Sequence, residues 1–380
     1  MKEPEFYKES GYEDIGYISP ELSSMDTYPD YIHQEVLDCV RRIRANQTTD
    51  TLSFAFLTDL HYAINKNHEI RMKRTINAYK EIAARVHIDK MVLGGDYTNE
   101  GCKEYKSDCY CELRAQLRGL TYFPVNGNHD DGTIWDARYL KAEKAVNHLT
   151  HDDLYKLFYN HLPYAGACFD KDNHALYYYS DDNIKKTRYI FLDSGDIPYV
   201  YDENGRLLYE GQGTFTLSQM QINWLVNEAL QFGEEGWSVI FVIHSVALPS
   251  QKEDELTRSF ETITVLNDIL DCYYNKECMD REYYEGDFRV HVKADFSKGI
   301  KADVIGLFAG DYHRDFVERT KSGIPYIFTE NVVMYSSVSP TQRVDGEKSE
   351  ILFDIVTVNK KERKIYITRV GAGNDRVIEY

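Results

Sequence analysis

The sequence predicts an α/β fold, and two observations support this prediction. In the first half of the chain, apolar strand-like runs alternate with segments whose apolar residues recur at helical spacing. This alternation favours parallel strands with helices across their faces. In the second half, residues 175–180 and 187–193 are two apolar runs separated by a short polar segment, which is typical of an antiparallel pair.

The elements of the first half follow one another as helix and strand in turn. Residues 1–30 are acidic and rich in Tyr, and we expect them to pack as an extension over the main body. The elements predicted after them are a helix over 31–47, a strand over 51–57, a helix from Ile70 to Val86, a strand over 88–96, a helix over 103–118 and a strand over 121–130.

The second half adds strands and one strongly patterned helix. Ser218-Gln-Met-Gln221 matches a capping box, and the residues after it repeat at helical spacing as far as Leu230. The remaining predictions are a strand over 237–245, a helix near 254–272, a polar aromatic stretch over 273–300, strands within 303–315 and 324–330, and a hairpin of 351–358 with 364–370. We find no repeat or linker. We therefore expect residues 1–50 to pack on one domain over 51–380, with an insertion around 273–300.

Charge excludes several classes of partner. The chain of 380 residues has 44 Lys and Arg against 62 Asp and Glu, a formal net charge of −18. Non-specific nucleic-acid binding and docking on anionic membranes both need positive charge, so we expect neither. The N-terminus lacks the apolar core of a signal peptide, and 7 scattered cysteines indicate reduced, mostly buried thiols. We therefore expect a cytoplasmic protein.

Five short polar motifs each follow an apolar strand. They are Asp59-Leu-His61, Gly95-Asp96, Gly127-Asn-His-Asp130, His244 and Gly310-Asp-Tyr-His313. Ligands bind outside the carboxyl ends of parallel strands, so we expect the motifs to converge. If strand geometry continues through the two i,i+2 pairs, the members of each pair point the same way. Taken singly, each motif also fits an ordinary turn, and His244 a core histidine. Together, their oxygen and nitrogen donors favour a site for Mn²⁺, Fe, Zn²⁺ or Mg²⁺.

In this order, the motifs resemble the pattern of the calcineurin-like metallophosphoesterases: D-x-H, G-D, G-N-H-[DE], H and G-H-x-H. The resemblance spans residues 59–313 and includes the segment 213–225. It implies a four-layer αββα sandwich that holds two divalent metal ions at its strand ends. By the resemblance, the ligands of the first ion are Asp59, His61, Asp96 and His313. Those of the second are Asp96, Asn128, His244 and Asp311.

The resemblance also implies a mechanism of phosphoester hydrolysis. A water shared by the two ions attacks phosphorus as hydroxide, and His129 donates a proton to the leaving oxygen as general acid. Asn99 matches the family position whose side chain orients that histidine. A turn-forming asparagine explains Asn99 equally well.

Two positions depart from the family pattern. Asp311 stands where the G-H-x-H motif has a histidine, which predicts a harder second site that favours Mn²⁺, Fe or Mg²⁺, with Zn²⁺ still possible. A weakened second site is the alternative. Glu100 stands where the Ser/Thr protein phosphatases of this superfamily have a phosphate-binding Arg, which argues against that branch.

The function expected from these observations is metal-dependent hydrolysis of phosphomonoesters or phosphodiesters. Acidic character and the missing Arg favour a small molecule or a nucleotide as substrate. A nuclease or cyclic-nucleotide phosphodiesterase is the alternative enzyme, and a non-catalytic interaction module with the same fold is the alternative of another class. His129 favours an enzyme, because a module without turnover has no need of a general acid.

Overall fold

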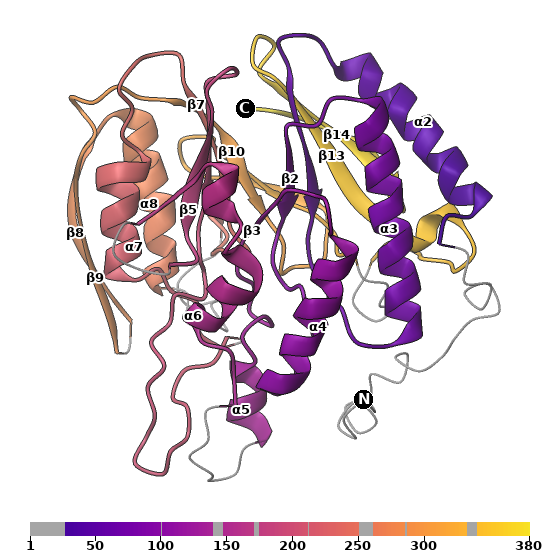
Figure 1. Ribbon diagram of the computed structural model, residues 1–380. Coiled ribbons are helices and arrows are strands. Elements are labelled where there is room, and N and C mark those ends of the chain that lie inside the picture. Colours follow the sequence, from indigo (N-terminus) through magenta and orange to yellow (C-terminus); the bar gives the residue numbers. More distant parts are fainter. Residues whose placement is uncertain are drawn as a thin grey trace.

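The fold is built on two β-sheets that lie face to face, with helices on both outer sides (Figure 1). This computed structural model describes residues 27–99, 101–139, 147–170, 175–211, 213–250, 261–285, 287–332 and 340–380. The layers confirm the predicted α/β sandwich.

The first sheet has six strands in the order β15-β14-β13-β1-β2-β3. Strands β1 (Leu52–Leu57), β2 (Lys90–Leu93) and β3 (Tyr122–Pro124) are parallel, as predicted. Antiparallel strands extend the sheet beyond β1; they are β13 (Leu352–Asn359), β14 (Lys364–Gly371) and β15 (Arg376–Glu379). Its outer side carries helices α2 (Asp30–Asn46), α3 (Lys66–Arg85) and α4 (Lys103–Gln116).

The second sheet has seven strands in the order β11-β12-β10-β7-β6-β5-β4. The strands are β4 (Ala167–Phe169), β5 (Tyr178–Asp182), β6 (Thr187–Phe191), β7 (Ser238–Val242), β10 (Asp303–Ala309), β11 (Phe316–Arg319) and β12 (Pro325–Phe328). Strands β6, β7, β10 and β12 are parallel, whereas β5 and β6 form the predicted antiparallel pair.

Helices α7 (Gln219–Trp224), which continues as a π-helix over Leu225–Ala229, and α8 (Glu261–Asn275) lie on the outer side of the second sheet. The shorter helical segments are α5 (Thr133–Tyr139), α6 (His151–Leu154), Tyr155–Tyr159, Leu162–Ala165 and Lys348–Glu350.

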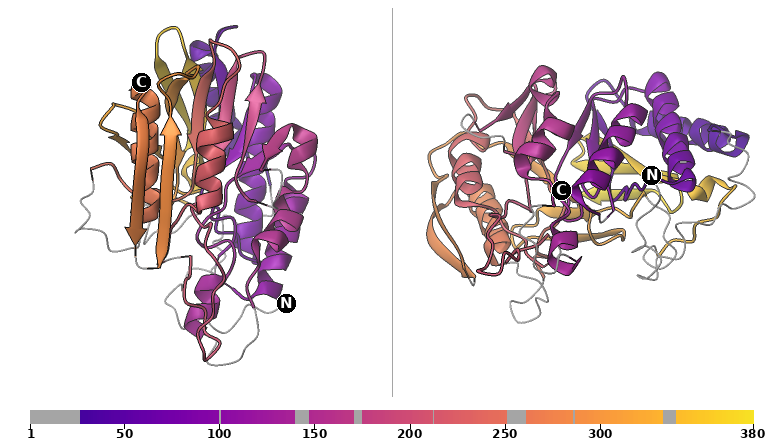
Figure 2. Two further views of the ribbon diagram at one scale, coloured as in Figure 1. Left: turned by 90° about the vertical axis from the view of Figure 1, so that its left-hand side faces the viewer. Right: turned by 60° about the horizontal axis from the view of Figure 1, so that its bottom comes forward.

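The polar stretch over 273–300 contains a β-hairpin that the sequence did not predict. Strands β8 (Cys278–Glu285) and β9 (Phe288–Asp295) pair as a two-stranded sheet. The hairpin packs on α7 and α8 and adds a fifth layer outside them (Figures 1 and 2). Alternate residues such as Val290 and Val292 are buried, and those between them are exposed. The hairpin therefore has one apolar face, toward the helices.

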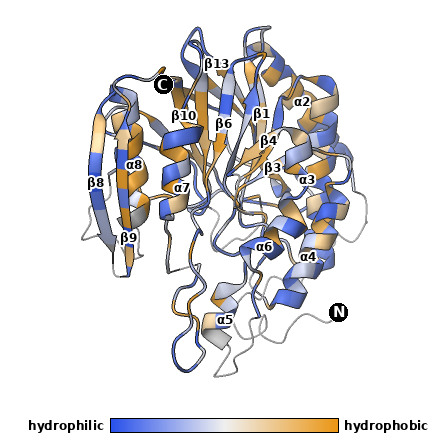
Figure 3. Cartoon of the chain, turned by 60° about the vertical axis from the view of Figure 1, so that its left-hand side comes forward, coloured by the Kyte–Doolittle hydropathy of each residue, from blue (hydrophilic) through white to orange (hydrophobic). Residues whose placement is uncertain are grey.

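The strands of both sheets are mostly apolar because they are covered on both faces (Figure 3). In β7, Val239 and Phe241 belong to the core beneath α7 and α8, whereas Ile240 and Val242 belong to the core that includes the opposite sheet. The ring of Phe54 lies 5.1 Å from that of Phe308. The sheets are thus joined by aromatic contacts between their facing strands.

Two local predictions need correction. Ser218 Oγ accepts a hydrogen bond from the Gln221 amide at 3.2 Å, but the Gln221 side chain bonds to both backbone groups of Asp193, so only half of the capping box forms. Asp196 accepts the Ser218 N–H instead. The cysteines are free, as predicted, but only Cys39 and Cys109 are buried. The prediction of mostly buried thiols is therefore wrong.

Candidate metal centre

Three strand ends bring four potential metal ligands together. Asp59 and His61 follow β1, Asp96 follows β2, and His313 follows β10. One donor atom from each of the four side chains lies within 4.8 Å of the others. The Nε2 atoms of His61 and His313 are 3.2 Å apart. Both sheets therefore contribute to one cluster of oxygen and nitrogen donors.

A second group of donors, His244 and Asn128, also lies beside Asp96. His244, which follows β7, places its Nε2 3.2 Å from Asp96 Oδ2 and 3.1 Å from Asn128 Oδ1. His61 Nε2 lies 3.5 Å from the same Asp96 oxygen. One Asp96 oxygen thus contacts a donor of each group, and the bridging role that the resemblance implies for Asp96 stays a prediction.

The ring of His244 is held in the orientation that a metal ligand needs. Its Nδ1 lies 2.7 Å from the carbonyl oxygen of Gly94. When Nδ1–H donates to that carbonyl, Nε2, beside Asp96 and Asn128, is the ring nitrogen left to bind a metal ion. Such a hydrogen bond from the second ring nitrogen is typical of metal-binding histidines.

Strand geometry does not continue through the ligand pairs, so the condition on which their common direction was expected is not met. The φ angles are +54° at Asp59, +41° at His61, +66° at Asp311 and +52° at His313, all in the left-handed region. Each such residue costs about 1–3 kcal/mol and persists only where its surroundings fix it. The chain turns sharply after β1 and β10, and the ligand pairs converge through these turns.

Two glycines of the motifs are required by close approach to the ligands. A Cβ atom at Gly127 would lie 2.1 Å from the Asp96 nitrogen. One at Gly310 would lie 2.0 Å from Thr58 Oγ1 and 2.5 Å from Asp59 Oδ2. No side chain fits at either position without moving the ligand beside it.

The electrostatics of the cluster suit cations. Asp59 and Asp96 are buried, and among the described residues they form ion pairs with histidines only. Burial opposes ionisation of Asp59, but His313 lowers its pKa below the ordinary value. Burial likewise opposes ionisation of Asp96, yet His244 lowers its pKa strongly. Burial lowers the pKa of His61 to about 3, so its ring is neutral. Ionised carboxylates beside the neutral imidazole of His61 fit a divalent ion. At His244, burial lowers the pKa but the Asp96 charge raises it well above the ordinary value, so a metal ion there would displace a proton.

Two further predicted groups, Asp311 and His129, lie at the edge of the cluster. The Asp311 amide donates to Asp59 Oδ1 at 3.2 Å. Burial lowers the pKa of His313, but the charges of Asp59, Asp96 and, least of the three, Asp311 raise it above the ordinary value. His129 is partly exposed; its amide donates to Asp96 Oδ1 at 2.8 Å, and its ring centroid lies 4.9 Å from that of His61. Metal binding by Asp311 stays a prediction.

Asp130, the last residue of the G-N-H-D motif, was given no role by the sequence. Its carboxylate accepts hydrogen bonds from the amides of Asp96 (2.9 Å), Tyr97 (2.7 Å) and Gly127 (2.8 Å). It therefore fastens the loop after β2 to the loop after β3. Burial and the nearby charge of Asp96 raise the pKa of Asp130 to about 7. The only signal in the sequence is its place in the motif.

Asn99 is buried, and its carbonyl oxygen accepts a hydrogen bond from Lys106 at 2.7 Å. The orienting role of Asn99 toward His129 stays a prediction. Glu100, the second departure from the family pattern, lies outside the described residues.

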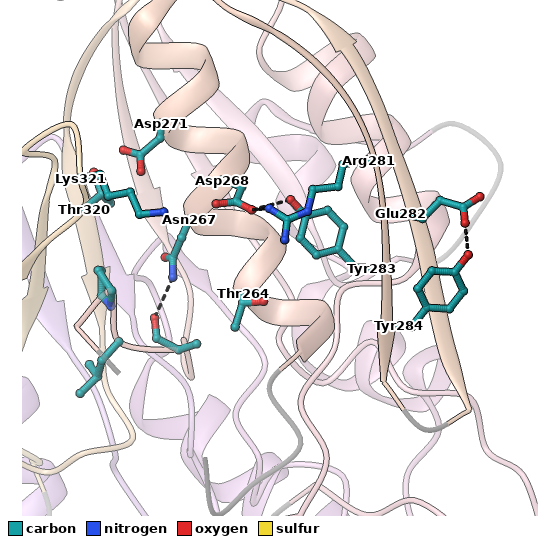
Figure 4. Close-up of a pocket in the computed structure, with 13 residues that line it drawn as sticks. Thr264, Asn267, Asp268, Asp271, Arg281, Glu282, Tyr283, Tyr284, Thr320 and Lys321 are labelled. Atoms are coloured by element: carbon teal, nitrogen blue, oxygen red, sulfur yellow. Dashed lines mark hydrogen bonds and ion pairs between the residues drawn. The ribbon is translucent and has the colours of Figure 1, made fainter. Parts of the chain in front are cut away.

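A separate hollow of about 340 Å³ lies between α8, β8 and the loop before β12 (Figure 4). Asp268 accepts hydrogen bonds there from Arg281 at 2.8 Å and from the Tyr283 hydroxyl at 2.6 Å. None of the predicted site residues lines this hollow. It is distinct from the candidate metal centre.

The layered fold and the paired carboxylate–histidine cluster define a metal-dependent phosphoesterase of the sandwich type. Residues 52–260, more than half of the chain, match the calcineurin-like phosphoesterase family, so the chain belongs to that family. It is accordingly a phosphoric ester hydrolase. Asp311 and His313 lie beyond the matched residues, and the fold brings them to the others.

Solved structures with a similar fold include a dimetal phosphatase from Danio rerio, with a TM-score of 0.55 and 12% identity over 87% of this chain and 99% of that chain. A 5'-nucleotidase from Candida albicans has a TM-score of 0.41 and 13% identity over 83% of this chain and 49% of that chain. No curated protein matches the chain. In the part of the chain that the structure describes, no helix has the length and apolar character needed to span a membrane.

Proposed function

We propose that the protein hydrolyses phosphomonoesters or phosphodiesters of a small molecule or nucleotide at a centre of two divalent metal ions. The observation that carries this proposal is the position of Asp96. One of its carboxylate oxygens lies 3.5 Å from His61 Nε2 and 3.2 Å from His244 Nε2, between two sets of donors. Metal pairs in such hydrolases share a ligand in this way.

Each set of residues has a part in this proposal. Asp59, His61, Asp96 and His313 hold one ion, and Asp96, Asn128, His244 and Asp311 hold the other. When bound, two dications activate a water molecule and neutralise charge on the phosphoryl oxygens. His129 is partly exposed beside the cluster and donates a proton to the leaving oxygen. Asn99 orients His129.

The ions that suit the site best are Mn²⁺, Fe or Mg²⁺. Asp311 adds a third carboxylate to Asp59 and Asp96, and carboxylate oxygens suit hard cations better than an imidazole does. Zn²⁺ is a weaker candidate for this reason.

A small substrate fits the charge of the protein. With a net charge of −18, the surface does not attract a nucleic acid through its backbone phosphates. The two bound ions supply the local positive charge that a single phosphoryl group needs.

Hydrolysis of chromogenic esters tests this function. We expect Mn²⁺-supplemented wild-type protein to hydrolyse 4-nitrophenyl phosphate or bis(4-nitrophenyl) phosphate, and chelation to abolish the activity. Asp96→Asn removes the shared charge and should lower kcat by about 10³-fold or more, because electrostatic stabilisation is usually the largest catalytic contribution.

His129→Ala should lower kcat on esters of basic alcohols by about 10²-fold or more. Wild-type protein that hydrolyses neither ester, or variants that both retain full activity, would show that the proposal is wrong. The first result would favour a non-catalytic module.

A further inference from the structure

Lys106 of α4 is the most unusual charged residue in the core. Its side chain is fully buried, although lysine is almost never buried unless its charge is compensated. Moving an unpaired ammonium group from water into the protein interior is costly. The ammonium group of a lysine at such a position must therefore be stabilised by contacts inside the protein.

The ammonium group of Lys106 makes three hydrogen bonds, one for each of its N–H groups. It donates to Thr98 Oγ1 at 2.8 Å, to the carbonyl oxygen of Asn99 at 2.7 Å and to the carbonyl oxygen of His129. All three acceptors are neutral oxygens. Because an ammonium group has three donors and no acceptor, its hydrogen-bonding capacity is filled.

These acceptors belong to two different loops of the active-site edge. Thr98 and Asn99 follow β2, and His129 follows β3. Lys106 therefore ties the backbone of the proposed general acid to the backbone of the residue proposed to orient it. The Asp130 carboxylate joins the same two loops, through the amides of Asp96 and Gly127.

The surroundings leave Lys106 little freedom. A Cβ atom at Gly132 would lie 3.1 Å from both Cδ and Cε of Lys106, and 2.8 Å from the Gly101 carbonyl oxygen. Tyr110, one turn further along α4, reaches the Asp130 carbonyl with its hydroxyl at 3.4 Å. Helix α4 (Figure 1) thus holds two consecutive carbonyl groups of the loop after β3, those of His129 and Asp130.

We propose that Lys106 is a positioning residue for proton donation, which sets the place of His129 and Asn99 relative to the metal ligands. This inference rests on the proposed function. None of the three hydrogen bonds of Lys106 goes to a predicted metal ligand. Lys106 acts by holding the carbonyl oxygens of Asn99 and His129. Misplacing a catalytic group by about 1 Å can cost about 10²-fold in rate.

Dependence on the leaving group distinguishes this role from a structural one. Phenolate is more basic than 4-nitrophenolate and needs protonation on departure, so phenyl phosphate depends on the general acid more than 4-nitrophenyl phosphate does. The ratio of kcat/KM for the two esters, measured with Mn²⁺ on one preparation, does not depend on the fraction of folded enzyme.

We expect Lys106→Met to lower the ratio of phenyl to 4-nitrophenyl phosphate hydrolysis by about 10-fold or more, in the direction of His129→Ala. Thr98→Val removes one of the three acceptors and should lower the same ratio by a smaller factor. This second variant keeps the test available if Lys106→Met does not fold. Lys90→Met is the matched control. Lys90 is a largely buried lysine of β2 that donates to Ser180 Oγ at 2.9 Å, and its loss should leave the ratio unchanged.

The outcomes separate the two proposals. If His129→Ala lowers the ratio but Lys106→Met and Thr98→Val retain the wild-type value, the role of Lys106 is wrong and the proposed function stands. If His129→Ala itself leaves the ratio unchanged, the general acid is wrong and the role of Lys106 is wrong with it.

Discussion

Asp193, a buried residue beyond the end of β6, illustrates how single residues respond to burial near the active-site edge. Its Oδ1 accepts hydrogen bonds from Asn126 Nδ2 at 3.1 Å and from the Gly195 amide at 2.8 Å. Burial raises its pKa from 3.8 to about 6, although the neighbouring His151 acts in the opposite direction. The native state therefore keeps a proton on Asp193 where the unfolded chain has lost it.

This pKa predicts how stability changes with pH. Between about pH 4 and pH 6 the native state binds more protons than the unfolded state, so the contribution of Asp193 to stability falls as pH rises through this range. Asp193→Asn keeps an oxygen for both donors and removes the charge. It should raise the free energy of unfolding at pH 8 by up to about 3 kcal/mol and change it little near pH 4.

Urea denaturation of wild type and Asp193→Asn at both pH values measures this difference. If the two proteins differed in free energy of unfolding by the same amount at pH 4 and pH 8, the raised pKa of Asp193 would be contradicted.

At the scale of elements, strand β14 anchors the loop that carries Asp311 and His313. Arg369 of β14 is buried; its Nε donates to Asp354 Oδ1 of β13 at 2.7 Å. Its Nη2 donates to both oxygens of Asp315, at 2.7 and 2.8 Å. Asp315 lies two residues after His313, so this ion pair joins the first sheet to the ligand loop of the second.

We predict that Arg369→Met lowers the free energy of unfolding by about 3 kcal/mol, because Asp354 and Asp315 lose their fully buried partner and keep only Arg376. It should also weaken Mn²⁺ binding, since the His313 loop loses its anchor. Urea denaturation and Mn²⁺ titration measure the two effects. The control is Arg363→Met, which breaks an exposed pair with Asp303 and should cost about 1 kcal/mol or less. Equal losses in the two variants would contradict the anchoring role.

Elements and ligands differ in how far the sequence predicts them. The strand within 237–245 is predictable because an uninterrupted apolar run is typical of a strand covered on both faces. The hairpin of β8 and β9 is harder to predict, because it has no uninterrupted apolar run and it packs mainly on helices instead of joining one of the two sheets. Period-two alternation over 289–293 was the available signal.

The residue types of the candidate ligands were predictable from the sequence, but their left-handed backbone conformation was not. The motifs identify Asp59 and His61 by residue type and place, yet aspartate and histidine adopt both extended and left-handed conformations. The role of Lys106 was hidden for another reason. Two of its three partners are backbone carbonyl oxygens, which exist at every position and leave no trace in the sequence.

At the scale of the whole molecule, the candidate metal centre lies where the two sheets meet. Asp59 and Asp96 follow strands of the first sheet, and His244 and His313 follow strands of the second. The site is therefore complete only when both sheets face each other. The net charge of −18 includes the carboxylates of the site, and two bound dications would turn that part of the acidic surface into an attractor for phosphate.

The most direct test of a shared centre is the metal content per chain after Mn²⁺ reconstitution and removal of free ions. The account predicts two ions per wild-type chain and, because Asp96 contacts both donor sets, less than about one ion per Asp96→Asn chain. Wild-type protein without bound metal, or an Asp96→Asn variant that retains both ions, would contradict the account. Two chelator-resistant zinc ions in the purified protein would contradict the preference for harder cations.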